Sequence, residues 1–396
     1  MFENKSIIIG VSGGIAAYKT AYLVSALSKT EADVNVIMTE NACEFISPLV
    51  FETLTGNKCY VDTFDRNFKF DVEHISLAKK ADIFMIAPAT ANVIAKIANG
   101  IADDMLTTTF LASKCKKIVS PAMNTAMFEN QITQGNIAKL KKYGIGVVEP
   151  QNGLLACGDV GAGKMPEPDF LFDVIEREIA REKDMLGKKV LVTAGATMES
   201  LDPVRFLTNH SSGKMGFAIA KEAMLRGAEV TVVKANTTAE IPNFIKIVEV
   251  SSAKDMFDAV TVLSDQQDII VKAAAVADYT PESYVDSKIK KKDGDLSIPL
   301  KRTMDILKYL GENKKEGQFL CGFSMETDNM LENSKAKLSK KNADMIVANN
   351  LRDAGSGFKT DTNAVTLITR DGHRSLELKS KAEVAKEIFD EILGLI

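Results

Sequence analysis

The sequence contains no tryptophan and only three histidines and five cysteines among its 396 residues. The cysteines are scattered along the chain at Cys43, Cys59, Cys115, Cys157 and Cys321. Their odd number and wide spacing match neither a disulfide scaffold nor the paired ligands of a zinc site. This pattern favours a reducing compartment, and we expect a cytoplasmic location.

Long apolar runs and a strong excess of one charge are also missing. No uninterrupted apolar segment is long enough to cross a bilayer, and no secretory signal opens the chain. The net charge of -4, with 45% hydrophobic and 26% charged residues, is ordinary for a soluble protein. We therefore expect neither nucleic acid nor membrane as a partner, and any anionic ligand must be held by local cations.

The length and the alternation of patterns predict two domains of one class. A chain of this length exceeds the usual single core, and both halves alternate strand-like runs with amphipathic helical patterns. We expect an α/β protein with two doubly wound, mainly parallel, Rossmann-like sheets, and no convincing internal repeat. A charged helix over Asp169–Lys183 closes the first half, which places the domains at 1–186 and 187–396. The expected strands include Val34–Met38, Ile83–Ala87, Lys117–Ser120, Lys189–Thr193, Glu229–Val233, Ile269–Ala273 and Met345–Ala348.

The first half opens with an apolar run that leads into Ser12-Gly13-Gly14-Ile15. A small hydroxyl and free backbone amides at a helix start suit a phosphate, although a glycine turn that only allows close packing remains equally open. Ligands of open parallel sheets bind beyond the carboxyl ends of the strands. We therefore expect Thr39, the segment 88–92 and the segment Pro121–Asn124 to line one crevice.

Three polar residues of the first half are candidates for chemistry. Taken singly, His74, Asn124 and Cys157 are each more often structural than functional. Together they offer a base or charge partner, an amide that orients a carboxylate, and a weak acid. The run Gly158–Lys164 has the spacing of a P-loop, but Met165 stands where the magnesium-binding hydroxyl belongs, so we predict no P-loop.

The second half carries an unusual mixture of small, hydroxyl, amide and cationic residues from Ala194 to Gly216. It follows a strand-like run and precedes a helical pattern over Phe217–Arg226, so it predicts a loop with an anion site. The lysine-rich run Lys288–Gly294 predicts an exposed hairpin or loop. By itself that run is typical of a solvated charge cluster.

These motifs carry a family resemblance. The first half resembles the flavin-containing cysteine decarboxylases in Ser12–Lys19, His74, Pro121–Asn124 and Ala156–Met165. The second half resembles phosphopantothenate-cysteine ligase in Ala194–Thr197, Asp202–Arg205, Ser211–Gly216, Ala275–Tyr279 and Lys288–Lys291. Their order along nearly the whole chain is similar to the bifunctional coenzyme A biosynthesis proteins, in which the two enzymes are fused.

The resemblance implies a flavin mechanism for the first half. FMN oxidises the thiol of 4'-phosphopantothenoylcysteine to a thioaldehyde, carbon dioxide leaves, and the reduced flavin returns the electrons. In this scheme His74 is the base or electrostatic partner, Asn124 holds the substrate carboxylate, and Cys157 donates a proton from a glycine-containing mobile clamp. The resemblance also implies that FMN is bound by Ser12, Gly13, Thr39 and Thr90.

For the second half, the resemblance implies that CTP activates 4'-phosphopantothenate as an acyl-cytidylate, from which L-cysteine displaces CMP. Asn209 then stabilises the activated intermediate, and Lys288 serves the second half-reaction. Magnesium is implied on the nucleotide phosphates and Asp278. The implied nucleotide-binding residues are Asp278, Lys288, Phe323, Lys337 and Lys341.

The sequence departs from the family pattern at two turns. Ala196 stands in Gly-Ala-Thr where Gly-Pro-Thr is usual, and Thr303-Met304 stands where Asn-Pro is common. These changes predict looser turns and a less secure preference for CTP, without loss of a charged group.

Three alternatives differ from a doubly active enzyme. In the first, one half survives only as a scaffold, and in the second, the chain is a non-catalytic flavoprotein that regulates a partner. The presence of His74, Asn124 and Cys157 beside Asn209 and Lys288 argues against both. A dinucleotide dehydrogenase requires a glycine fingerprint that this chain lacks. The resemblance further implies a homo-oligomer with trimeric decarboxylase contacts and dimeric ligase contacts.

Overall fold

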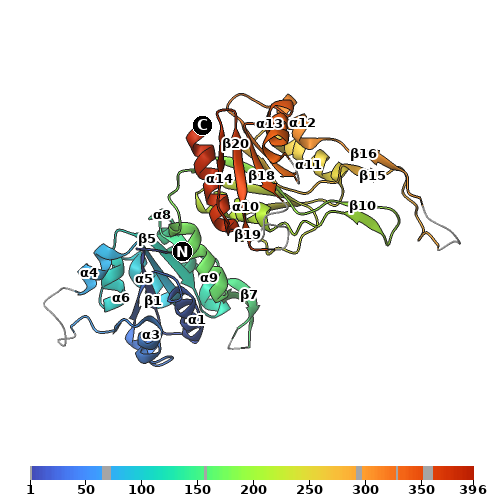
Figure 1. Cartoon of the computed structure of the whole chain (residues 1–396). Coiled ribbons are helices and arrows are strands. Elements are labelled where there is room, and N and C mark those ends of the chain that lie inside the picture. Colours follow the sequence, from blue (N-terminus) through green and yellow to red (C-terminus); the bar gives the residue numbers. More distant parts are fainter. Residues whose placement is uncertain (1, 65–72, 156–157, 291–296, 327–328, 351–359) are drawn as a thin grey trace. The chain divides into compact units, whose positions relative to one another are not determined.

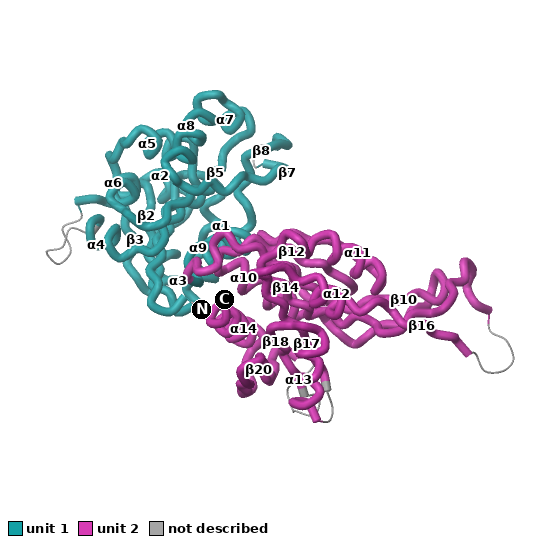
Figure 2. The backbone as a smooth tube through the Cα atoms, turned by 90° about the horizontal axis from the view of Figure 1, so that it is seen from above, with its two compact units in different colours: residues 1–181 teal, residues 182–396 magenta. Residues whose placement is uncertain are grey.

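The computed structural model describes residues 2–64, 73–155, 158–290, 297–326, 329–350 and 360–396. The chain forms two compact units, Met1–Arg181 and Glu182–Ile396, which are coloured separately in Figure 2. Within the described ranges, none of the helices combines the length and the apolar character needed to span a lipid bilayer.

The first unit is built on a parallel six-stranded sheet with the order β3-β2-β1-β4-β5-β6. Between β1 and β4 the order of the strands reverses, which creates a crevice at their carboxyl ends. The strands are β1 (Ser6–Val11), β2 (Asp33–Met38), β3 (Cys59–Tyr60), β4 (Ile83–Ala89), β5 (Lys116–Pro121) and β6 (Gly146–Val147).

Helices cover both faces of this sheet because its strands are apolar on both sides. Ile8 and Phe84 pack with α5, α6 and α8, and their neighbours Ile7 and Met85 are equally buried. Helices α1 and α9 pack together and contact β4 (Figure 1). The helices are α1 (Ala17–Leu27), α2 (Glu40–Cys43), α3 (Pro48–Thr55), α4 (Glu73–Lys80), α5 (Ala91–Ala98), α6 (Met105–Ala112), α7 (Thr125–Glu129), α8 (Gln131–Lys142) and α9 (Pro168–Ile179).

An antiparallel hairpin stands apart from this sheet. It consists of β7 (Gln151–Leu154) and β8 (Val160–Lys164) and packs on α7. The run Gly158–Lys164 therefore ends in a strand, whereas a P-loop leads into a helix. The prediction that this run is no P-loop is confirmed.

The second unit contains an eight-stranded sheet with the order β13-β12-β9-β14-β17-β18-β20-β21. Its first six strands are parallel and repeat the strand order of the first unit, and the last two are antiparallel. The strands are β9 (Lys189–Ala194), β12 (Glu229–Lys234), β13 (Lys246–Glu249), β14 (Ile269–Lys272), β17 (Phe319–Glu326), β18 (Met345–Asn350), β20 (Val365–Thr369) and β21 (His373–Ser375). The predicted fold class, two doubly wound and mainly parallel sheets, is confirmed.

Helices α10 and α14 pack against each other, and α10 contacts β9 and β12. The opposite group, α11, α12 and α13, shares one apolar core with the sheet residues Leu191, Ile270 and Leu320. The helices are α10 (Lys214–Leu225), α11 (Ala253–Ser264), α12 (Ile306–Glu312), α13 (Met330–Lys340) and α14 (Lys381–Leu395).

Short ribbons complete the second unit. The paired strands are β10 (Met198–Ser200) with β11 (Phe206–Thr208), β15 (Tyr279–Pro281) with β16 (Leu300–Arg302), and β19 (Thr362–Asn363) with β22 (Lys379–Ser380). The first two ribbons project beyond the eight-stranded sheet (Figures 1 and 2). The segment 194–216, which the sequence predicts as a loop, thus contains the β10–β11 ribbon. Residues 288–290 of the lysine-rich run lie between β15 and β16, as predicted, and residues 291–294 of the run are outside the described residues.

A buried arginine ties α10 to the start of the unit and to α14. The Arg226 guanidinium bonds Glu222 at 3.0 Å, Asp184 at 3.2 Å, and Asp390 on α14. Arg226 and Glu222 are both almost fully buried. Removing one partner of such a network leaves a charge without compensation in a medium of low dielectric constant.

We expect Arg226→Met to lower the free energy of unfolding of the second unit by about 3–5 kcal/mol, because the Glu222 carboxylate is then buried alone. Urea unfolding of the full chain, followed by circular dichroism, measures this loss. The double variant Glu222→Leu, Arg226→Met removes both charges and should recover most of the stability. A single-variant loss below about 1 kcal/mol would contradict the network's role.

Candidate functional sites

The first unit has a pocket of about 600 Å³ at the carboxyl ends of its central strands, beside the β7–β8 hairpin. Most of its lining is apolar, with Asn124 and Lys164 among the exceptions. The lining residues are Gly13, Gly14, Ile15, Ala16, Tyr18, Lys19, Thr90, Ala91, Ala122, Met123, Asn124, Met127, Leu154, Leu155, Gly163, Lys164 and Met165. The predicted crevice is present, and it brings together the Ser12–Lys19, 88–92 and Pro121–Asn124 segments. A flat apolar ring with a phosphate tail fits such a lining.

Three helix N-termini meet at this pocket. Thr90 caps α5 by accepting a hydrogen bond from the Val93 amide, and Asn124 caps α7 by accepting one from the Ala126 amide. No side chain caps α1. The Ala17 and Lys19 N–H groups donate to the Gly14 and Ala16 carbonyls, and the positive dipole end of α1, which no side chain caps, still suits an anion.

Ser12 holds the turn between β1 and α1 through side-chain hydrogen bonds. Its side chain is fully buried, its hydroxyl donates to the Pro88 carbonyl at 2.8 Å, and it accepts from the Thr90 N–H at 3.0 Å. It joins the ends of β1 and β4 and is not among the residues that line the pocket. Gly13 does line it, and a side chain there would collide with the Asn41 backbone at 2.8 Å.

The hairpin is held close to Asn124. The Asn124 amide donates to the Asp159 carboxylate at 2.8 Å, and the Met123 N–H donates to the Gly163 carbonyl at 3.1 Å. Gly163 has φ 127°, and a Cβ atom there would lie 2.2 Å from the Met123 oxygen, so only glycine fits. Cys157 falls between β7 and β8 in the sequence and lies outside the described residues, so its role stays a prediction.

Two residues predicted for this site lie elsewhere in the protomer. His74 is half-buried on α4, which packs against α6, and it does not line the pocket. Thr39 caps α2 by accepting a hydrogen bond from the Ala42 N–H at 3.2 Å. Thr39 follows β2 at the same edge of the sheet, where its N–H donates to the Val11 carbonyl at 3.0 Å, but neither residue lines the pocket.

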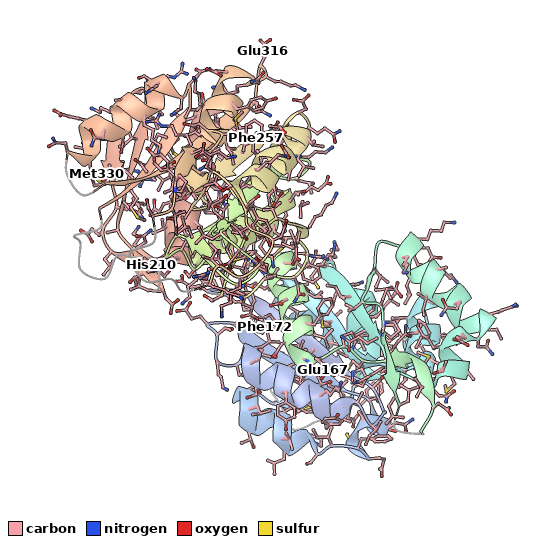
Figure 3. All side chains as sticks on the ribbon, turned by 90° about the vertical axis from the view of Figure 1, so that its right-hand side faces the viewer. Glu167, Phe172, His210, Phe257, Glu316 and Met330 are labelled. Atoms are coloured by element: carbon pink, nitrogen blue, oxygen red, sulfur yellow. The ribbon has the colours of Figure 1, made fainter. Side chains whose placement is uncertain are left out.

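Lys19 is a residue whose role the sequence motif did not reveal. Its side chain is nearly buried, and its ammonium donates to Glu167 at 2.8 Å and to the Met165 carbonyl at 3.3 Å. Lys19 holds the pKa of the Glu167 carboxyl below its usual value. The Glu167 side chain is labelled in Figure 3. The pair fixes the segment after β8 on α1 and so closes one wall of the pocket.

The second unit has two adjacent pockets at the carboxyl ends of β14 and β17. The larger, about 640 Å³, includes Thr303 and is here called the Thr303 pocket. The smaller, about 350 Å³, includes Asn209 and is called the Asn209 pocket. Both are lined by Lys272, Val276, Asp278, Phe323 and Lys337. A reaction between a ligand of one pocket and a ligand of the other must take place at this shared boundary.

The Thr303 pocket collects four of the predicted nucleotide-binding residues, Asp278, Phe323, Lys337 and Lys341. Lys337 donates to the Phe323 carbonyl at 2.9 Å, and Lys341 pairs with the Asp305 carboxylate that caps α12. Burial tends to raise the pKa of Asp305, but the Lys341 hydrogen bond holds that pKa below its usual value. Cationic and aromatic groups around an open cavity suit a nucleotide.

The Asn209 pocket receives the start of α10, where Gly213 has φ 81° and no side chain caps the helix. Lys214 on α10 and the nearly buried Lys381 on α14 also line the pocket. The Asn209 amide donates to the Ala275 carbonyl at 3.2 Å. An uncapped helix start and two lysines favour an anionic ligand.

Lys288 does not line either pocket. It is exposed in the β15–β16 hairpin, next to Ile289, whose N–H donates to Asp202 at 3.1 Å and whose carbonyl accepts from Arg205 at 2.7 Å. The Arg205 hydrogen bond lowers the pKa of the buried Asp202 carboxyl well below its usual range. The Asp202–Arg205 pair therefore anchors the base of the loop that carries Lys288.

Residues at both departures from the family pattern make hydrogen bonds in the structure. The Ala196 N–H, which a proline would lack, donates to the Asn236 carbonyl at 2.9 Å. The Thr303 hydroxyl donates to the Ala277 carbonyl at 2.6 Å, and its N–H donates to the Asp278 carbonyl at 3.0 Å. These hydrogen bonds help to hold both turns, and the looser turns stay a prediction.

A magnesium ion would find few protein ligands in this unit. In the part of the chain that the structure describes, no group of three or more acidic, histidine or cysteine side chains converges. The exposed Asp278 carboxylate at the shared boundary offers one oxygen donor. This fits a magnesium ion that is held mainly by nucleotide phosphates and water.

Comparison with known proteins gives independent evidence for the family to which the chain belongs. Residues 1–180 match the family model described as "Flavoprotein", and residues 185–395 match "DNA/pantothenate metabolism flavoprotein C-terminal domain". A coenzyme A biosynthesis bifunctional protein CoaBC from Bacillus subtilis (strain 168) is 46% identical over 399 residues, covering 100% of this chain and 98% of the relative. The Escherichia coli (strain K12) protein of the same name is 40% identical, with coverage of 98% and 97%.

Solved structures match each half separately. The C-terminal domain of a coenzyme A biosynthesis bifunctional protein is 45% identical, covers 52% of this chain and 94% of its own, and has a TM-score of 0.45. A mutant PPC decarboxylase complexed with pantothenoylaminoethenethiol is 30% identical, covers 43% and 96%, and has a TM-score of 0.40. With relatives above 40% identity over nearly their full length, the chain belongs to the family of bifunctional coenzyme A biosynthesis proteins.

Proposed function

We propose that this chain makes 4'-phosphopantetheine in two steps, with residues 187–396 acting as a CTP-dependent phosphopantothenate-cysteine ligase and residues 1–186 as an FMN-dependent decarboxylase. The observation that carries the proposal is the set of three pockets. Two of them meet at Lys272 and Asp278 in the second unit, and the third is the apolar pocket of the first unit. Membership of the bifunctional family supports both activities.

In the first unit, FMN would occupy the apolar pocket, with its phosphate at the uncapped start of α1. When bound, it supplies a two-electron acceptor for the substrate thiol and later returns the electrons. Asn124, at the pocket wall, is placed to orient the carboxylate that is lost. The hairpin that carries Leu154 and Leu155 excludes water from the reacting carbon, and Cys157 follows them in the sequence as the proposed proton donor.

In the second unit, the Thr303 pocket would hold CTP and the Asn209 pocket would hold phosphopantothenate. The substrate carboxylate attacks the α-phosphorus, the bond to the β-phosphate oxygen breaks, and pyrophosphate leaves. The cysteine amine then attacks the acyl carbon, loses a proton and displaces CMP. Lys337 and Lys341 balance the phosphate charge, Asp278 would hold magnesium, and Asn209 would contact the activated intermediate.

Assembly would complete the decarboxylase site. Four apolar side chains of its pocket are at least half exposed, namely Ile15 (59%), Tyr18 (53%), Met127 (50%) and Leu154 (67%). Such a rim is typical of a surface that a partner covers. Because His74 does not line the pocket of its own protomer, a trimer in which another subunit supplies His74 accounts for both observations. In the second unit, the exposed Val204, Phe206 and Leu207 of the β10–β11 ribbon support a dimer contact.

Incubation of the purified protein with phosphopantothenate, cysteine, CTP and magnesium tests the proposal. We expect both phosphopantothenoylcysteine and phosphopantetheine by mass, with a flavin absorption spectrum. Replacement of CTP by ATP should lower the ligation rate, and light scattering should show a homo-oligomer. Accumulation of phosphopantothenoylcysteine alone would refute the decarboxylase half, and the absence of both products would refute the whole assignment. A cytoplasmic location fits these small-molecule substrates.

A further inference from the structure

Lys272 occupies the boundary of the two pockets in the second unit. It is the last residue of β14, which pairs with β9 on one side and β17 on the other. Because β14 is paired on both sides, the Lys272 backbone is held by two neighbouring strands. It is also one of only five residues that line both pockets among those the structure describes.

The Lys272 ammonium lacks the protein partners that its neighbours have. Lys337 donates to the Phe323 carbonyl, and Lys341 is paired with Asp305. For Lys272, no hydrogen bond or ion pair with any described residue is found. A half-buried cation without a partner is costly unless a ligand supplies the opposite charge.

The charges around Lys272 oppose its protonation. Burial is the main cause that lowers the pKa of Lys272 to about 8, and the nearby Lys337 and Lys341 lower it further. Asp305 and Asp278 act in the opposite direction without restoring the usual value. Across the Asn209 pocket the facing ionisable groups are Lys214 on α10, which is paired with Asp361 at 2.6 Å, and Lys381 on α14.

We propose that the Lys272 side chain binds the α-phosphate of the nucleotide at the boundary of the two pockets, where the substrate carboxylate attacks. This rests on the proposed ligase function and adds a residue that neither the motifs nor the family match assigns. When the carboxylate attacks, a further oxygen bonds to the α-phosphorus, and negative charge builds up on the phosphate oxygens. A cation already held in place on β14 stabilises this charge without any rearrangement of the protein.

A consequence is proton uptake when the nucleotide binds. With a pKa of about 8, Lys272 is about half protonated at pH 8 in the free protein. A bound phosphate favours the charged form and raises this pKa, so binding takes up a proton between pH 8 and the pKa of the complex. The affinity for nucleotide should therefore fall as pH rises above about 8.

Isothermal titration calorimetry with CTP and magnesium, without phosphopantothenate, tests the proposal because no turnover occurs. Titrations at pH 8 in two buffers of different ionisation enthalpy give the number of protons taken up. We expect the natural protein to take up protons when CTP binds, and we expect no proton uptake at position 272 in Lys272→Met or Lys272→Arg. Lys272→Met should bind CTP roughly 10- to 100-fold more weakly, whereas Lys272→Arg should stay close to the natural protein.

Lys234→Met is the matched control. Lys234 also ends a strand of the same sheet, but it pairs with Glu249 at 2.8 Å and lines neither pocket. This variant should keep the natural proton uptake and affinity. Equal proton uptake by Lys272→Met and the natural protein, or equal affinity, would overturn the proposal. If the natural protein binds ATP and not CTP, the same comparison is made with ATP, and then only the assignment of CTP fails.

Discussion

Replacement of Asn124 by aspartate should slow decarboxylation by roughly a thousandfold and leave ligation unchanged. The amide of Asn124 donates to Asp159 on the hairpin and, in our proposal, to the substrate carboxylate. A carboxylate at this position still accepts the hydrogen bond of the Ala126 N–H, so α7 keeps its cap. It cannot donate, and it repels both Asp159 and the substrate. Mass detection of phosphopantetheine from added phosphopantothenoylcysteine measures the rate.

Two further variants separate chemistry from folding. Asn130 caps α8 in the same way, accepting from the Ile132 N–H at 2.9 Å, but it lies outside the pocket, so Asn130→Asp should decarboxylate normally. The double variant Asn124→Asp, Asp159→Asn restores a donor and an acceptor between α7 and the hairpin. It should bind flavin normally and remain inactive. Recovery of activity in the double variant would show that Asn124 only positions the hairpin.

The fold was predictable because its signals are local. Buried parallel strands have apolar side chains on both faces, so runs such as Ile83–Ala87 and Ile269–Ala273 are recognised without tertiary information. The structure extends or trims these runs by one or two residues, as at Ile83–Ala89 and Ile269–Lys272. The family resemblance is confirmed by relatives that cover the full chain.

The shared strand order of the two sheets was not predictable. Both units place their first six parallel strands in the same order, yet the sequence shows no convincing repeat. Strand order depends on which strands pair, and many different apolar residues satisfy the same pairing. The small ribbon β10–β11 was missed for a related reason. All three residues of β11 are exposed, so the strand has no apolar alternation to reveal it.

The candidate sites were predictable where residues follow strand ends. Thr90 comes directly after β4, Asn124 follows β5 after Ala122 and Met123, and the crossover topology brings both to one pocket. His74 lies on α4 and does not line the pocket, so its role stays a prediction. Lys272 was missed because a single lysine at the end of the apolar run Ile269-Ile270-Val271 looks like an ordinary strand boundary. Its significance comes from two pockets that meet there, which is a tertiary property.

Replacement of Lys288 by glutamine should stop the ligase between its two half-reactions. The residue is exposed on a hairpin that Asp202 and Arg205 hold through the Ile289 backbone, so its replacement should leave the unit folded. We expect the release of pyrophosphate to continue for one turnover, the acyl-cytidylate to accumulate, and the formation of phosphopantothenoylcysteine to fall by roughly 10²- to 10³-fold.

Rapid quenching followed by mass detection of the acyl-cytidylate distinguishes this result from a simple loss of binding. Lys301→Gln is the control, because Lys301 is exposed on the adjoining strand β16 and donates to the Glu282 carbonyl, away from both pockets. It should ligate normally. If Lys288→Gln also loses the first burst of pyrophosphate, Lys288 acts on the triphosphate, and its function overlaps with that proposed for Lys272. If the burst persists, the two cations serve different steps, Lys288 on the hairpin at the acyl carbon and Lys272 on β14 at the phosphorus.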